Sequence, residues 1–339
     1  MNRLGIGYSC LNNDEKKAYE IIEESLNRKS SSCDISSVKK RIDIGKIYEA
    51  VLGDHPEIIY VNCTFFQQSE SLFERKLIYS IVLKGRKAQD CEKELQDAVE
   101  SAAWEIDKKA KNDRDILLGI SEYLQKNVIY DNEERDHSVR GKSRSPMAHT
   151  AYGALVNHKA VCDGFSKAYA ILCQYFGIKC MVVNGRSAFR NSPKVEHAWN
   201  IVEFEGKNYH IDSTWDSNVY RDLGVHSYDY FGLDDDEISI EHDWDYTKTP
   251  ICNSTKLSYF LYNALYANFE SQITDILVRQ WKRNEKCLRV KISPKIFLSN
   301  DEKSQIHKIM DEAAGRSGFY GKYRYSWEEQ MRILIIILE

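Results

Sequence analysis

Residues 161–168 read V-C-D-G-F-S-K-A. This stretch opens a run with helical apolar spacing that is closed by Gly177, a residue type that often ends α-helices. We therefore predict a helix over 162–176 with Cys162 in its first turn. There, peptide N–H groups and the positive end of the helix dipole face the sulfur, which favours the nucleophilic thiolate. None of the other cysteines has so clear a placement.

Two later segments carry polar groups that could serve such a thiol: E-H-A-W-N at 196–200 and Y-H-I-D-S-T-W-D at 209–216. Their apolar residues predict strands over 195–204 and 207–212, joined by a two-residue Glu-Gly turn. A turn of this length determines which residues of the hairpin lie opposite each other.

In that register His197 faces Thr214. Asp212 faces Trp199, which puts its side chain on the same face as His197, one diagonal step or about 7–8 Å away between backbones. A carboxylate in this place would fix the tautomer and orientation of the imidazole while the other ring nitrogen reaches for Cys162. A turn one residue longer would move one strand's side chains to the opposite face.

In order and spacing, Cys162, His197 and Asp212 resemble the catalytic motifs of the transglutaminase-like superfamily, specifically its bacterial members. The resemblance covers about residues 151–245 and includes Y-F-G-L-D at 230–234 and His242. It implies an α+β fold with a papain-like transglutaminase core, in which the helix bearing the cysteine packs on an antiparallel sheet.

The resemblance also implies acyl transfer through a thioester. Cys162 would attack the carboxamide carbon, His197 would take and return the proton, and Asp212 would orient His197. With water as the second nucleophile the enzyme is a cysteine peptidase or amidase. With a lysine amine it is a protein-glutamine gamma-glutamyltransferase. The third hypothesis is not an enzyme: an inactive binding or scaffold module with the same fold.

Two further side chains are candidates for the site. The backbone N–H of Cys162 could be one donor of an oxyanion hole, and Tyr152 is our candidate for the second. Trp199 is a candidate for a wall of the acyl pocket. Packing roles for Tyr152 and Trp199 stay open, and we interpret His210 and His242 as structural histidines.

The chain divides into three predicted regions: a helical N-terminal region with a β-hairpin and a closing charged loop (1–146), the catalytic core (147–250) and a small α/β domain (251–339). In the first region the patterns predict helices over 14–27, 37–51, 90–109 and 114–127, the last of them N-capped at Asn112. They also predict strands over 58–66 and 72–83 around a turn at 67–70, and an exposed loop over 131–146. In the last region they predict strands over 258–268, 288–293, 323–327 and 332–338 and helices over 270–283 and 301–315.

Composition narrows the class of protein. The 339 residues are 42% hydrophobic and 29% charged, which excludes a largely disordered chain. The net charge of -4 lacks the excess of positive charge that is typical of nucleic-acid-binding proteins. No signal-peptide core or membrane-length apolar run is present, and nine cysteines without a C-x-x-C predict reduced thiols. We therefore expect a cytoplasmic protein whose partner is a protein or peptide substrate, not a nucleic acid or membrane; the oligomeric state stays open.

No cofactor or metal is expected. His149, His158 and Cys162 do not have the paired spacing of a zinc site. The acidic run at 234–237 lacks the glycine-turned loop of a recognisable calcium site, so we interpret it as a solvated turn.

Overall fold

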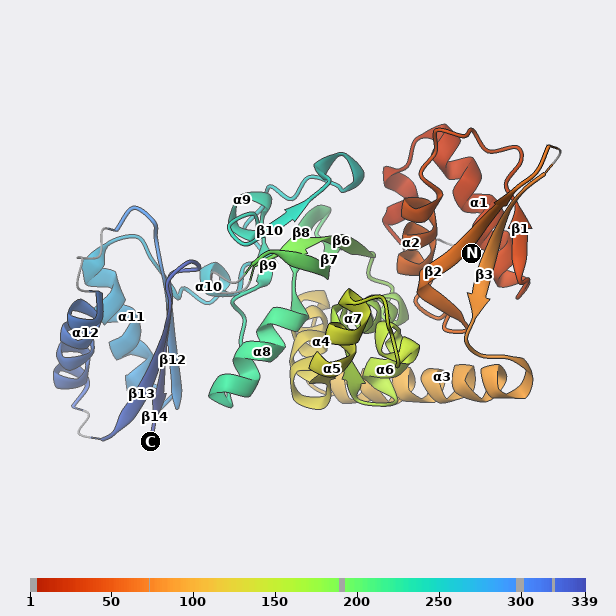
Figure 1. The fold of residues 1–339 in the computed structure, drawn as a ribbon. Helices are drawn as coiled ribbons and strands as arrows, with labels where there is room; N and C mark the ends of the chain where they lie inside the picture. The colour runs from red at the N-terminus through yellow and green to blue at the C-terminus, as the bar shows by residue number, and fades with distance from the viewer. Residues whose placement is uncertain (1–4, 73, 189–192, 297–301, 319–320) are drawn as a thin grey trace.

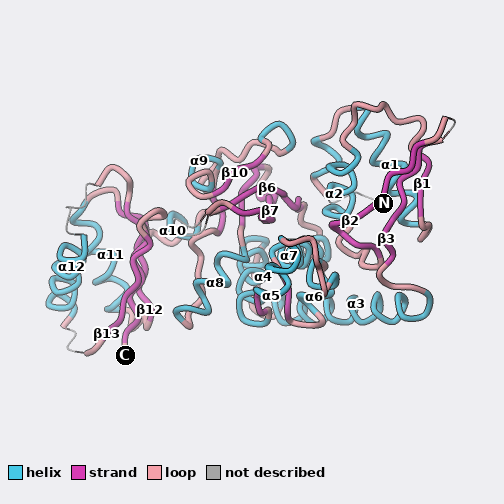
Figure 2. Tube along the Cα trace, viewed as in Figure 1, coloured by secondary structure: helices cyan, strands magenta, loops and turns pink. Residues whose placement is uncertain are grey.

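A computed structural model describes residues 5–72, 74–188, 193–296, 302–318 and 321–339. The described chain combines helices with three larger β-sheets, which confirms the predicted mixture of α and β structure. One sheet lies toward each end of an elongated molecule and one lies in the middle (Figures 1 and 2). Among the described helices, none is both long enough and apolar enough to cross a membrane.

The N-terminal region builds an antiparallel sheet of order β1-β3-β2 covered by two helices. Its elements are η1 (Gly7–Cys10), α1 (Asn13–Asn27), β1 (Ser32–Asp34), α2 (Ile44–Asp54), β2 (Val61–Glu70) and β3 (Arg75–Ile81). The predicted hairpin forms, but its turn was misplaced, because residues 67–70 continue β2 and pair with β3. The second helix starts later than predicted, since the Asp43 side chain caps it by accepting from the N–H groups of Gly45 and Lys46.

Two long helices connect this region to the middle of the molecule. They are α3 (Gly85–Asp107) and α4 (Asp113–Asn127), and the predicted N-cap Asn112 is confirmed. Both helices pack on α7 (Cys162–Tyr175), and α3 also contacts α6 (Ala151–Leu155). The boundary at residue 146 stays a prediction.

The segment 131–146 was wrongly predicted as a loop. It contains α5 (Asn132–Val139), N-capped by the Asp131 carboxylate, which accepts from the N–H of Glu134 at 3.0 Å. Polar contacts hold this helix, so its sequence has no apolar period to reveal it. The chain continues through η2 (Pro146–His149).

The central sheet has the order β10-β6-β7-β8-β9, and all its neighbours are antiparallel. Its strands are β6 (Cys180–Ser187), β7 (Val195–Phe204), β8 (Lys207–Ile211), β9 (Phe231–Leu233) and β10 (His242–Trp244). Helix α7 packs against β6 and β7, and its C-terminus is followed by Gly177 in the left-handed region (φ 75°). The fold that the resemblance implies is therefore present: a helix that begins with the cysteine, on an antiparallel sheet.

The predicted two-residue turn between β7 and β8 is confirmed. Phe204 pairs with Lys207, and Glu205 and Gly206 both have positive φ (50° and 70°), as tight hairpin turns require. The ladder ends earlier than predicted, at Asn200 opposite Ile211. The expected pairing of Thr214 and Asp212 with β7 therefore does not form, because α8 (Ser213–Leu223) begins there.

The C-terminal region forms a sheet of order β11-β12-β14-β13 with two long helices and one short helical turn. Its elements are α10 (Tyr259–Tyr262), β11 (Tyr266–Ala267), α11 (Glu270–Lys282), β12 (Cys287–Ile292), α12 (Glu302–Ser317), β13 (Tyr323–Glu328) and β14 (Ile333–Leu338). The predicted strand over 258–268 was wrong in its first half, where the apolar residues form a helical turn that buries Phe260 and ends before Ala264 (φ 54°).

Candidate active site

Cys162 is the first residue of α7 and is partly exposed. The N-cap, Val161, offers no side-chain acceptor, and the first-turn N–H groups of a helix have no partner within it. Two residues on, Gly164 lets another segment approach closely, because a Cβ there would lie 2.4 Å from the carbonyl oxygen of Ala148. The start of the helix is thus fixed by backbone packing while its N–H groups remain near the sulfur.

His197 and Asp212 are joined by a short hydrogen bond, with Nε2 donating to Oδ2 at 2.6 Å. Both side chains are buried. Burial opposes charge on the imidazole, but the Asp212 carboxylate and hydrogen bonding to the Cys162 thiol raise the pKa of His197 to about 10. The imidazolium form is therefore favoured between the thiol and the carboxylate.

Asp212 is held by more than the histidine. Its Oδ1 caps α8 by accepting from the backbone N–H groups of Thr214 and Trp215, both at 3.0 Å. Burial would raise the pKa of Asp212, but the contacts with His197 and His242 lower it to about 2. The carboxylate is therefore ionised and fixed in orientation, from a position just beyond the end of β8.

His242 contacts this same carboxylate, a role that sequence reasoning missed. Its Nε2 lies 2.9 Å from Oδ2 of Asp212, and burial lowers the pKa of His242 to about 4. Its Nδ1 is buried without a hydrogen-bond partner among the described residues, so a second proton would be uncompensated. The indole N–H of Trp215 also donates to this Nε2, at 3.1 Å, so His242 links Trp215 to the carboxylate. The residue comes from β10, and no local pattern in the sequence points to this contact.

Trp199 does not have the position expected of a pocket wall, because it is fully buried. Its ring stacks at 6.1 Å from His197, and its indole N–H donates to Nδ1 of His210 at 2.9 Å. His210 then donates through Nε2 to Asp235 at 2.9 Å, in agreement with a structural role. The partly exposed aromatic side chain beside the imidazole is Trp215, at 4.8 Å between ring centroids.

Tyr152 has its hydroxyl directed elsewhere: it donates to Oε2 of Glu94 in α3 at 2.5 Å. That bond raises the pKa of Tyr152, and it occupies the proton that an oxyanion would need. Tyr130 is the aromatic residue that sequence reasoning missed. It lies in β4 (Ile129–Tyr130), which pairs with β5 (Lys159–Ala160) immediately before the nucleophile, and burial and the nearby Cys162 raise its pKa.

Within the part of the chain that the structure describes, two clusters contain three His, Cys, Asp or Glu side chains whose possible metal-ligand atoms lie within 4.8 Å of one another. The first is His197, Asp212 and His242, which is the site itself. In the second, formed by His210, Asp235 and Cys252, the donor-only indole of Trp199 requires a lone pair on Nδ1 of His210. The proton is then on Nε2, which points at the carboxylate, so this ring has no free lone pair for a metal.

The other residues considered as metal ligands make hydrogen bonds or ion pairs within the protein. His149 bonds Asp163 and Ser138. In the acidic run, Asp234 caps α9 (Asp235–Ile238) and Glu237 pairs with Lys291 at 2.6 Å. Two carboxylates of this run therefore already have partners within the protein.

Comparison with known proteins agrees with this architecture. Residues 100–213 match the model of the transglutaminase-like superfamily. Human kyphoscoliosis peptidase is 35% identical over 72 residues, which are 19% of this chain and 11% of that protein. The mouse kyphoscoliosis peptidase is 28% identical over 118 residues, 33% of this chain and 17% of that protein.

The chain thus matches only a small part of the length of these relatives. A solved structure of a TGase is 18% identical and covers 44% of each chain, with a TM-score of 0.32, too low to support a conclusion. Residues 100–213 are therefore similar to the transglutaminase-like superfamily, and the two peptidase relatives support this likeness.

Proposed function

We propose that the protein is a thiol-dependent acyl-transfer enzyme that cleaves an amide or peptide bond. The observation that supports this most is the buried 2.6 Å bond between His197 and Asp212, with the Cys162 thiol close enough to the imidazole to contribute to the raised pKa of His197. A nucleophile, a base and a group that orients the base are the three parts that covalent acyl transfer needs.

In the proposed reaction Sγ of Cys162 attacks the carbonyl carbon, and its proton resides on His197. The imidazolium gives that proton to the leaving amine as the C–N bond breaks, which leaves a thioester on Cys162. His197 then takes a proton from water, whose oxygen attacks the thioester carbon. The carboxylic acid leaves and the thiol regains its proton from His197.

Asp212 keeps one proton of the imidazole on Nε2, so that the other nitrogen is available to Cys162. For the oxyanion we propose the N–H of Cys162 at the helix start as one donor. The hydroxyl of Tyr130 is the proposed second donor in place of Tyr152, because the Tyr152 hydroxyl donates its hydrogen bond to Glu94.

The test is mass spectrometry of a peptide mixture after incubation with the full chain, with and without a primary amine. Truncated peptides with an added water indicate hydrolysis; glutamine deamidation or amine incorporation indicates a transamidase instead. Cys162→Ala should abolish product, whereas Cys10→Ala, which also removes a partly exposed thiol, should leave turnover unchanged. Equal turnover by Cys162→Ala would refute the proposal, and no product from any substrate class would favour the scaffold reading.

A further inference from the structure

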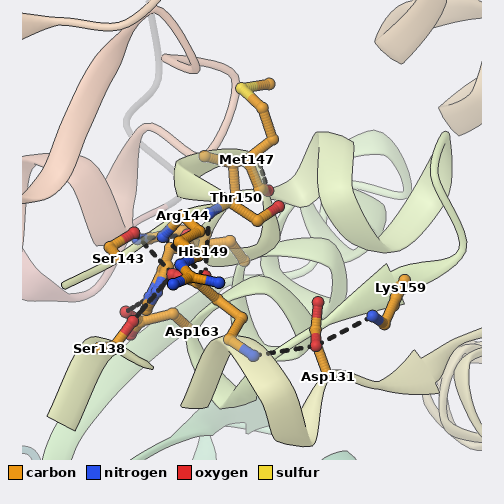
Figure 3. A network of polar contacts seen from close by, with 12 residues as sticks. Asp131, Ser138, Ser143, Arg144, Met147, His149, Thr150, Lys159 and Asp163 are labelled. Atoms are coloured by element: carbon orange, nitrogen blue, oxygen red, sulfur yellow. Dashed lines mark hydrogen bonds and ion pairs between the residues drawn. The ribbon is translucent and has the colours of Figure 1, made fainter. Parts of the chain in front are cut away.

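A second histidine is paired with the residue that follows the nucleophile. Nδ1 of His149 lies 3.0 Å from Oδ2 of Asp163 in the first turn of α7. His149 is 7% exposed and comes from η2, which Gly164 allows to pack directly on the helix. Figure 3 shows His149 in this network of polar contacts, with Asp163 and Ser138 among its labelled neighbours.

Both ring nitrogens of His149 have hydrogen-bond partners. A carboxylate can only accept, so Nδ1 donates to Asp163. On the other side Nε2 lies 2.9 Å from Oγ of Ser138, whose own proton goes to Oε1 of Glu134 at 2.9 Å. The Ser138 oxygen must therefore accept from Nε2. Both ring nitrogens of His149 thus face acceptor oxygens, and Glu134 lies 3.4 Å from Nε2.

Glu134 anchors the outer end of this arrangement. Besides Ser138, its carboxylate accepts from the Ser143 hydroxyl at 2.6 Å and from the backbone N–H groups of Arg144 and Ser145 at 3.0 and 2.9 Å. Burial would raise the pKa of Glu134, but these bonds lower it to about 2. The segment after α5 is thereby fixed to His149, and through it to the start of α7.

Lys167 provides a positive charge near Asp163. It lies one helical turn further along α7, is 6% exposed, and donates to the backbone carbonyl of His149 at 3.0 Å. Burial would raise the pKa of Asp163, but Lys167 and then His149 lower it to about 2. Asp163 is therefore a carboxylate, next in sequence to the sulfur that must become a thiolate.

An uncompensated carboxylate beside a thiol opposes its ionisation, since like charges disfavour the charged form. We propose that His149 is a positioning residue for the nucleophile: by pairing with Asp163 it offsets this opposing charge and fixes the first turn of α7. This inference rests on the proposed role of Cys162. It links the reactivity of the thiol to the segment that Glu134 anchors, which no earlier step of the mechanism uses.

The other charged or titratable groups around this pair come from every neighbouring element. They are Lys167 on α7, Glu134 on α5, Tyr130 on β4, Cys63 on β2, Glu49 on α2 and His197 on β7. They are the same in all variants below, so a change in the pH profile reports the substituted pair.

The experiment measures the rate of iodoacetamide alkylation at Cys162 as a function of pH in the full chain, by peptide mapping. For His149→Gln we expect the midpoint of the profile to rise by about half a unit to one unit, because the Asp163 charge loses a partner. In the double variant with Asp163→Asn the opposing charge is gone, and the midpoint should return close to that of the wild type. His137→Gln, which removes a histidine on the same segment that pairs with Glu133 and not with Asp163, is the control and should leave the midpoint in place.

An unchanged midpoint in His149→Gln, or a double variant still shifted like the single one, would overturn the inference. If His149→Gln does not fold, Asp163→Asn alone decides: the midpoint should fall, and an unchanged or raised midpoint refutes the charge effect. Alkylation requires no turnover. A protein that shows these shifts but cleaves no amide would therefore contradict the proposed function and leave the role of His149 intact.

Discussion

The carboxylate of Asp212 orients His197 with one oxygen and caps helix α8 with the other. The proposed catalytic acid–base pair and the packing of a helix on the core thus depend on a single side chain. This double use separates two consequences of substitution: loss of the charge affects His197, whereas loss of the acceptor oxygen affects the helix.

For Asp212→Asn we expect a fall in kcat of about 10²- to 10⁴-fold, because the imidazolium loses its counter-charge; the contribution of the ion pair to stability is lost, while the amide oxygen still caps α8. For Asp212→Ala we expect the same fall in activity and about 1 kcal/mol less stability, the typical value of an N-cap. Steady-state kinetics and urea unfolding of both variants measure this. Equal stability of the two variants would show that the cap contributes nothing.

His242→Gln should reduce kcat by roughly tenfold, the smaller effect expected of a group that acts through Asp212. Because the contact with His242 lowers the pKa of Asp212, loss of that contact should raise this pKa and move the acidic limb of the pH–rate profile upward. The control is His210→Gln, which removes a buried histidine that bonds Asp235 instead. An unshifted acidic limb in His242→Gln would mean that the contact has no effect on the reaction.

The local patterns predicted the site well where it lies on regular elements. The helix from Cys162, the strands around the two-residue turn and the register at Phe204 and Lys207 follow from apolar spacing and turn chemistry. Asp212 reaches His197 by a different path from the predicted one, since it caps α8 after the ladder has ended. The strand pattern could not show this, because a residue at a strand end and an N-cap look alike in a short window.

The contacts made by distant segments could not be predicted. Tyr130, His149 and His242 reach the site from β4, η2 and β10, and none lies in a motif that indicates its neighbour. Tyr152 and Trp199 were chosen for closeness in sequence, yet tertiary packing directs one hydroxyl to Glu94 and buries the other ring. Helix α5 was missed for a related reason: it is stabilised by polar partners that lie outside it, Asp131 and Ser143.

The ion pair also predicts a pH dependence of stability. His197 has a pKa raised to about 10, so its contribution is complete below its usual value near 6.5 and is lost as pH rises toward 10. Asp212 has a pKa lowered to about 2, so its contribution is complete above its usual value near 3.9 and is lost as pH falls toward 2. The pair therefore stabilises most between about pH 4 and 6.5.

The measurement is the urea midpoint of the wild type and of His197→Gln from pH 3 to pH 9. The difference between the two should be largest near pH 5 and should shrink toward both ends. Other buried groups titrate in both proteins alike and cancel in the difference. A difference that does not vary with pH would contradict an ion pair and leave only a hydrogen bond.

Tyr130 and Tyr152 offer a matched test of the oxyanion hole, because each substitution to phenylalanine removes one hydroxyl. Tyr130→Phe should lower kcat by about 10²-fold with KM little changed, the cost typical of one oxyanion donor. Tyr152→Phe removes only the bond to Glu94 and should leave kcat within about twofold. Both keep the aromatic ring, so thermal unfolding of the two variants should stay near that of the wild type. If Tyr152→Phe proved the more damaging for turnover, the second donor would be Tyr152 after all and its bond to Glu94 would have to open during the reaction.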